Sequence, residues 1–130
     1  MIFKPWRPVF AWAAVIFGLS SIPGSSLPEV PLAQADKLVH GAIYLVLGLL
    51  LGRALAAATR LPKGGRVALA FLLATAYGVT DELHQLFTPR RSCDWHDVVA
   101  DAVGGLLGAV LAATLFARRR SPNQPFVNQP

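Results

Sequence analysis

Four long apolar segments, joined by short connections, constrain the fold of this chain more than any other feature. They cover about residues 8–22, 38–59, 67–87 and 97–117 and are rich in Ala, Leu, Val, Gly and Phe. Gly and Pro residues, which break helices, fall between them. Crossing the ~30 Å hydrocarbon core of a bilayer takes about 20 helical residues. The last three segments reach that length only by including charged residues. The pattern predicts an all-α integral membrane bundle of four transmembrane helices.

The composition supports this prediction and excludes several other classes of protein. Of the 130 residues, 54% are hydrophobic and 15% are charged, against roughly 25% charged in a soluble domain. That argues against a soluble globular enzyme, whose surface needs more charge, and against a disordered chain, which needs less hydrophobicity. The single cysteine, Cys93, excludes an intramolecular disulfide and a multi-cysteine zinc site. The basic residues do not gather in one patch, so we expect no nucleic-acid partner.

The charged residues predict the orientation of the bundle. If the N-terminus is cytoplasmic, 9 of the 12 basic residues fall inside and all 7 acidic residues fall at the outer side. This is a strong positive-inside bias, and it places both termini in the cytoplasm. Residues 1–120 form the predicted membrane domain, and the polar residues 121–130 are predicted to be a disordered cytoplasmic tail. One alternative stays open: the first segment, ending near Ser20 and Ser21, resembles a cleavable secretory signal.

Polar residues at the outer ends of three predicted helices recur every four positions and therefore share one face of each helix. The third segment shows why they must enter the membrane. From Val67 to Thr80 it has 14 uncharged residues, about 21 Å of helix at ~1.5 Å per residue, which is too short to cross. Ionisable groups at such depth normally face a bundle interior or a wet cavity. We therefore expect a polar pocket, open to the outside, built from three stripes: Asp36, His40 and Tyr44; Tyr77, Asp81 and Gln85; Asp97 and Asp101.

The chemistry of this pocket stays open at the level of the sequence. One alternative is that the three stripes form an internal ion-pair network that only fixes helix packing, since such a network would show the same pattern. An enzyme could use Asp81 or Glu82 as general base and His40 as acid or orienting group. A divalent cation is one cofactor that the residues allow, with carboxylates for a hard ion and His40 or His84 for a softer one. The metal-ligand candidates are Asp81, Glu82, His84, Asp97, Asp101 and His40. A transporter is disfavoured because the inner halves of the helices are nearly free of polar groups.

The order and spacing of these motifs resemble the VanZ-like family. The similarity rests on Asp36-Lys37-Leu38-Val39-His40, on residues 77–85 (YGVTDELHQ), on Arg91 with Asp97, and on residues 104–108 (GGLLG). It covers roughly residues 36–108. The polar positions of the family fall on Asp36, Lys37, His40, Tyr44, Asp81, Glu82, Gln85, Arg91 and Asp97. Two residues depart from the family pattern: Asp101 stands where Asn is frequent and adds an acid to the pocket, and Arg90 stands where Gly is frequent.

The resemblance implies a multi-pass protein of the bacterial plasma membrane that affects susceptibility to glycopeptides of the teicoplanin type. Its ligand would be a lipid headgroup, a cell-wall precursor or the glycopeptide, bound at the ten polar positions including Asp101. The alternative is a membrane enzyme acting on a lipid-linked phosphate substrate at the outer leaflet. A homo-oligomer is compatible with either.

Overall fold

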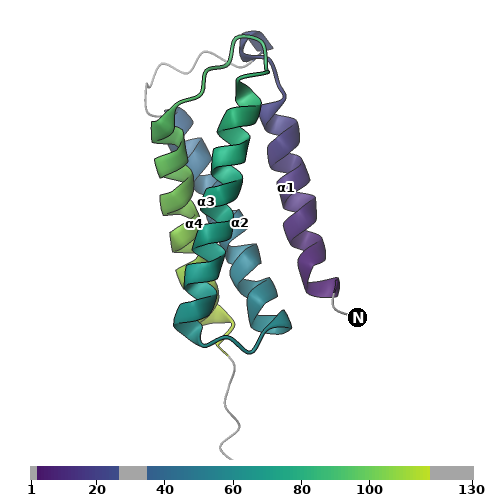
Figure 1. Cartoon of the computed structure of the whole chain (residues 1–130), viewed down its shortest axis with the longest axis vertical. Helices are drawn as coiled ribbons and strands as arrows, with labels where there is room; N and C mark the ends of the chain where they lie inside the picture. The colour runs from purple at the N-terminus through teal and green to yellow at the C-terminus, as the bar shows by residue number, and fades with distance from the viewer. Residues whose placement is uncertain (1–2, 27–34, 118–130) are drawn as a thin grey trace, which may run out of the picture.

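The computed structural model describes residues 3–26 and 35–117, which form four α-helices that run alternately up and down (Figure 1). The helices are α1 (Arg7–Ser20), α2 (Ala35–Ala58), α3 (Lys63–Gln85) and α4 (Trp95–Leu115), with short 3-10 turns at Lys4–Trp6 and Gly24–Ser26. The described residues contain no strand. The predicted all-α fold with four helices is thus confirmed. The predicted tail, residues 121–130, lies outside the described residues, as do Glu29, Arg118, Arg119 and Arg120.

The last three helices begin earlier than the apolar segments do. α2 begins at Ala35, α3 at Lys63 and α4 at Trp95, which adds a polar or charged first turn to each. The side chain of Asp94 caps α4 by accepting a hydrogen bond from the backbone N–H of His96 at 2.9 Å. Such a cap satisfies one of the backbone donors that a helix leaves free at its start. The extra turns carry several of the charged groups described below.

Glycines bring α2 and α4 into backbone contact, and this pair of helices forms the centre of the bundle. A Cβ on Gly48 would overlap the carbonyl oxygen of Gly105, and a Cβ on Gly104 would overlap that of Gly41. One turn further along, a Cβ on Gly108 would meet the carbonyl of Leu45. Gly104 and Gly108, four residues apart on one face of α4, therefore allow the two backbones to approach closely.

The first helix packs against α2 and α3 through a few specific contacts. The indole N–H of Trp12 donates to the carbonyl oxygen of Ile43 at 3.0 Å, and the hydroxyl of Tyr77 donates to the carbonyl oxygen of Ala13 at 2.7 Å. Val9 and Ile16 are buried in the same face. These contacts hold the C-terminal end of α1 beside the polar ends of α2 and α3.

Two of the helices, α2 and α4, are long and apolar enough to cross a membrane. α1 has 14 residues, and α3 is more polar because its apolar stretch lies between Lys63 and Arg66 on one side and Asp81 and Glu82 on the other. Large apolar side chains are exposed around the outside of the bundle, among them Phe10, Phe17, Leu72, Val103 and Leu107. Helices that are apolar on their outer faces are typical of proteins in contact with lipid.

Candidate functional site

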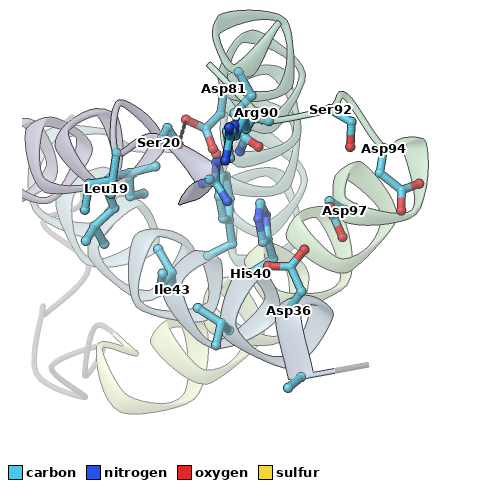
Figure 2. Close-up of a pocket in the computed structure, with 18 residues that line it drawn as sticks. Leu19, Ser20, Asp36, His40, Ile43, Asp81, Arg90, Ser92, Asp94 and Asp97 are labelled. Atoms are coloured by element: carbon cyan, nitrogen blue, oxygen red, sulfur yellow. Dashed lines mark hydrogen bonds between the residues drawn. The ribbon is translucent and has the colours of Figure 1, made fainter. Parts of the chain in front are cut away.

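A pocket of about 640 Å³ opens at the end of the bundle where the α1–α2 and α3–α4 connections lie. Figure 2 shows its walls: α1 at the left, α2 below, α3 above and α4 at the right. Polar and apolar side chains share the lining. The lining residues are Ile16, Leu19, Ser20, Ile22, Gly24, Ala35, Asp36, Val39, His40, Ile43, Tyr44, Asp81, Gln85, Arg90, Arg91, Ser92, Asp94 and Asp97.

Lys37 joins the start of α2 to the start of α4. Its ammonium donates to Oδ2 of Asp94 and to Oδ1 of Asp97, each at 3.0 Å. One ammonium is thereby shared by two carboxylates, and Oδ1 of Asp94 also lies 2.7 Å from Nδ1 of His96.

His40 and Asp101 form a second link between α2 and α4, deeper in the bundle. Nδ1 of His40 lies 3.0 Å from Oδ1 of Asp101, whose side chain is fully buried. Gly78 on α3 makes room for this carboxylate, since a Cβ there would stand 2.9 Å from Oδ2 of Asp101. The contact fixes the imidazole ring at the pocket wall, because one ring nitrogen is held by the carboxylate.

The adjacent acids Asp81 and Glu82 point to different partners. Oδ1 of Asp81 accepts a hydrogen bond from the hydroxyl of Ser20 on α1 at 2.5 Å. Glu82 is 1% exposed, and its oxygens accept from the backbone N–H of Asp94 at 2.8 Å and from the side-chain amide of Gln85 at 3.3 Å. Asp81 therefore faces the pocket, whereas Glu82 ties α3 to the start of α4.

The turn after α3 carries Arg90 in the left-handed region, with φ of 58°. Glycine adopts this conformation at little cost, and an arginine does not. The backbone N–H of Gly24 donates to the carbonyl oxygen of Pro89 at 3.0 Å, and a Cβ on Gly24 would overlap the carbonyl oxygen of Arg90. The α1–α2 connection thus packs directly on this turn, which holds Arg90 and Arg91 at the rim of the pocket.

The structure brings most of the predicted ligand-binding residues to one place. Lining the pocket are Asp36, His40, Tyr44, Asp81, Gln85, Arg91 and Asp97. Lys37, Glu82 and Asp101 lie behind that lining and hold Asp97, Asp94 and His40. Of the three catalytic candidates, His40 and Asp81 are accessible from the pocket, and Glu82 is buried.

Two groups of side chains could hold a metal ion, and each contains His40. Asp36, His40 and Asp97 form one group, and His40, Glu82 and Asp101 form the other, with possible ligand atoms within 4.8 Å of one another. Neither group includes Asp81 or His84. The ring of His84 stacks on Phe17 of α1 with ring centroids 4.4 Å apart, and Nε2 of His84 lies 3.0 Å from the hydroxyl of Ser21.

Several pocket residues were absent from the sequence prediction, and most of them come from loops or from α1. Ser20, Ser92, Asp94 and the apolar side chains of α1 are the main ones. For Asp94 a signal existed: an Asp directly before an apolar run, with a second acid three residues later, is a helix N-cap pattern. Cleavage near Ser20 and Ser21, the alternative considered above, would remove the α1 wall of the pocket.

The ion pairs of Asp94 predict a dependence of stability on pH. The backbone N–H of His96, the ammonium of Lys37 and the ring of His96 hold the pKa of Asp94 well below its usual range. A lowered pKa gives stability that is present above the unfolded value of about 4 and is lost as the pH falls below it. We expect Asp94→Asn, which retains a capping side chain, to lose less thermal stability than the wild type between pH 6 and pH 3. Equal losses, in unfolding of the purified protein in detergent, would contradict this.

Comparison with known proteins identifies the family. The family model described as VanZ/LLP1 matches residues 2–117, which includes all four helices and the pocket. No curated protein and no solved structure matches the chain. The matched family and the two apolar helices are together consistent with a membrane protein. The chain belongs to the VanZ/LLP1 family.

Proposed function

We propose that this chain is a four-span protein of the bacterial plasma membrane whose pocket faces outward and binds a lipid headgroup or a cell-wall precursor. One observation carries the proposal: a pocket of about 640 Å³ combines arginines, carboxylates and apolar side chains at one end of an apolar bundle. Ligand sites are typically concave and mostly apolar with a few placed polar groups. An amphipathic ligand from the membrane matches such a lining.

The distribution of basic residues supports the orientation. Arg60, Lys63 and Arg66 lie at the α2–α3 connection, at the opposite end of the bundle from the pocket, and α1 begins at that same end (Figure 1). Under the positive-inside rule this end is cytoplasmic. Both termini would then be cytoplasmic, and the pocket would meet the outer leaflet.

The pairing of charges supports phosphate-bearing ligands. Lys37 is engaged by Asp94 and Asp97, so Arg90 and Arg91 are the cations that line the pocket itself. Arginine is well suited to phosphate oxygens because its planar donors can bind two at once. We propose that binding of such an envelope component modulates susceptibility to teicoplanin-type glycopeptides. Susceptibility of matched strains with and without the chain tests this role.

The orientation is tested with Cys93, which is exposed between the pocket residues Ser92 and Asp94. We expect a membrane-impermeant maleimide to label Cys93 in intact cells. As a matched control, Gly64→Cys in a Cys93→Ser background places the thiol at the α2–α3 end, where no atom lies within 4 Å of an added Cβ. That variant should react only after permeabilisation. The reverse pattern would put the pocket in the cytoplasm and overturn the proposed orientation.

A membrane enzyme acting on a lipid-linked phosphate is the second candidate. The observation that favours it is the group Asp36, His40 and Asp97, which could hold a divalent cation beside Arg90 and Arg91. A histidine whose other nitrogen is held by a carboxylate is the usual arrangement of a metal ligand, and Asp101 is so placed on His40. In this alternative His40 would bind the metal or transfer a proton. Release of phosphate by the purified protein, abolished by a chelator, is the result that would favour it.

A further inference from the structure

Two hydrogen-bond donors at the pocket have no partner among the described residues. The hydroxyl of Tyr44 and Nε of Arg91 are both buried and unpaired, and both residues line the pocket. Tyr44 is 1% exposed, and a buried tyrosine hydroxyl ordinarily finds a partner because leaving one unpaired is costly. Two unpaired donors in a pocket that Arg90 also lines call for an acceptor-rich group such as a phosphate.

The opposite wall of the pocket is rich in carboxylates. Asp94 and Asp97 share the ammonium of Lys37, and Asp94 also contacts the ring of His96 at 2.7 Å. Asp36, at the rim, forms no ion pair with any residue in the described ranges. Nearby unpaired carboxylates repel one another unless a cation joins them. A free anion alone would leave this wall unsatisfied, whereas a ligand that also carries an ammonium group would match it.

The third part of the lining is apolar and reaches the lipid-facing surface. Leu19 on α1 and Val39 on α2 line the pocket and are also 43% and 54% exposed. Figure 2 shows the division of the pocket: Leu19 and Ile43 lie on the α1 side, Arg90 near the middle, and Asp36 and Asp97 on the α4 side. A hydrocarbon chain in the pocket would therefore contact side chains that are also exposed on the outside of the bundle.

We propose that the pocket binds a zwitterionic phospholipid whose headgroup ends in a primary ammonium. The phosphodiester accepts hydrogen bonds from Tyr44 and Arg91, the ammonium meets Asp36 and Asp97, and the acyl chain runs past Leu19 and Val39. This inference rests on the proposed function, since a lipid reaches the pocket only if the bundle lies in a membrane. It adds the chemical identity of the headgroup to the proposed function.

Binding to the purified protein in detergent tests the proposal, with probes that differ by one feature. Dioleoylphosphatidylethanolamine carries phosphate, ammonium and chains. Dioleoylphosphatidylglycerol lacks the ammonium, dioleoylglycerol also lacks the phosphate, and free glycerophosphoethanolamine keeps the phosphodiester and the ammonium but lacks the acyl chains. We expect the first to bind at least about tenfold more tightly than each of the others, the loss expected for one charge-assisted hydrogen bond. Equal affinity for the three lipids would overturn headgroup recognition. Equal affinity for free glycerophosphoethanolamine would show that the acyl chains contribute nothing and would overturn a lipid as the source of the headgroup.

Single-atom variants separate ligand contacts from structural effects. Tyr44→Phe removes only the unpaired hydroxyl, so affinity for both phospholipids should fall about tenfold. Tyr77→Phe is the matched control, because that hydroxyl donates to Ala13 and should leave affinity unchanged. Asp36→Asn should weaken phosphatidylethanolamine but not phosphatidylglycerol. If Tyr44→Phe and Tyr77→Phe behave alike, Tyr44 has no contact with the headgroup and the proposal is wrong.

The lipid-binding test and the Cys93 labelling test can fail independently of each other. Outward labelling of Cys93 with no preference among the lipids overturns the headgroup assignment alone. Labelling only after permeabilisation overturns the outward orientation, whereas a preference for phosphatidylethanolamine measured in detergent would still hold.

Discussion

Asp101→Ala is expected to destabilise the bundle by about 3–5 kcal/mol, the usual effect of removing one partner from a buried charged pair. Asp101 is fully buried, and its Oδ1 lies 3.0 Å from Nδ1 of His40. Without the carboxylate, a buried imidazole nitrogen loses its partner and a cavity opens beside Gly78. The free energy of unfolding, measured in detergent with increasing denaturant, gives the size of the effect.

Two further variants show whether the pair itself is responsible. Asp101→Asn retains a side chain of the same shape with one acceptor oxygen, and it should be markedly less destabilising than Asp101→Ala. Replacing His40 and Asp101 together by leucine removes both polar groups, and such exchanges are often close to neutral. The double variant is compared with the single leucine variants of His40 and Asp101. If its loss of unfolding free energy equals the sum of the two single losses, the side chains do not stabilise each other and the interpretation is wrong.

Gly48→Ala is expected to separate α2 from α4 and to destabilise the protein by about 1–3 kcal/mol or more, because overpacking a close contact forces the backbone to shift. The added Cβ would overlap the carbonyl oxygen of Gly105, and backbone atoms cannot move aside as a flexible side chain can. The same experiment in detergent measures the loss. Ligand binding should weaken too, because α2 carries Asp36 and His40 whereas α4 carries Asp97.

Gly18→Ala and Gly64→Ala are the matched controls for this contact. Both positions are helical, and neither has an atom within 4 Å of an added Cβ. Alanine has the higher helix propensity by up to about 1 kcal/mol, so these variants should be neutral or slightly more stable. A loss of stability in the controls equal to that of Gly48→Ala would mean that helix propensity or detergent, rather than the α2–α4 contact, sets the result.

The number and type of helices could be predicted from the sequence because apolar runs and breakers report them directly. The first residue of each helix was harder to predict from the sequence. α2 begins at Ala35 and α3 at Lys63, each about one turn before the apolar run. Lys37 and Arg66 have helix propensities close to that of leucine, and an acid such as Asp36 is favourable in a first turn. Hydropathy reports burial in lipid and does not report backbone conformation, so a polar first turn is invisible to it.

The position of the candidate pocket could also be predicted from the sequence, since a spacing of four residues along a helix places Asp36, His40 and Tyr44 on one face. The structure shows that all three line one pocket with Asp81 and Asp97. Spacing cannot tell which of two adjacent residues turns inward toward another helix and which toward a cavity. That depends on how α3 is rotated against its neighbours.

The adjacent pair Asp81 and Glu82, and the nearby His84, illustrate this limit. Asp81 bonds Ser20 at the pocket, Glu82 is buried against the start of α4, and His84 stacks on Phe17 away from both candidate metal groups. The contribution of Ser20 could not be foreseen, because it depends on α1 lying beside α3, and that placement comes from contacts such as Tyr77 with Ala13.

The pairing of acids with earlier residues has a consequence for biogenesis. Asp81 bonds Ser20, Asp97 bonds Lys37 and Asp101 bonds His40. In each pair the acid is translated after its partner. An unpaired carboxylate is expensive inside a bilayer, and here the ribosome delivers each of these three carboxylates to a helix that has already been made. In a bilayer, as proposed above, these three carboxylates would meet partners already made, whereas the buried Glu82 would wait for Asp94, which is translated after it.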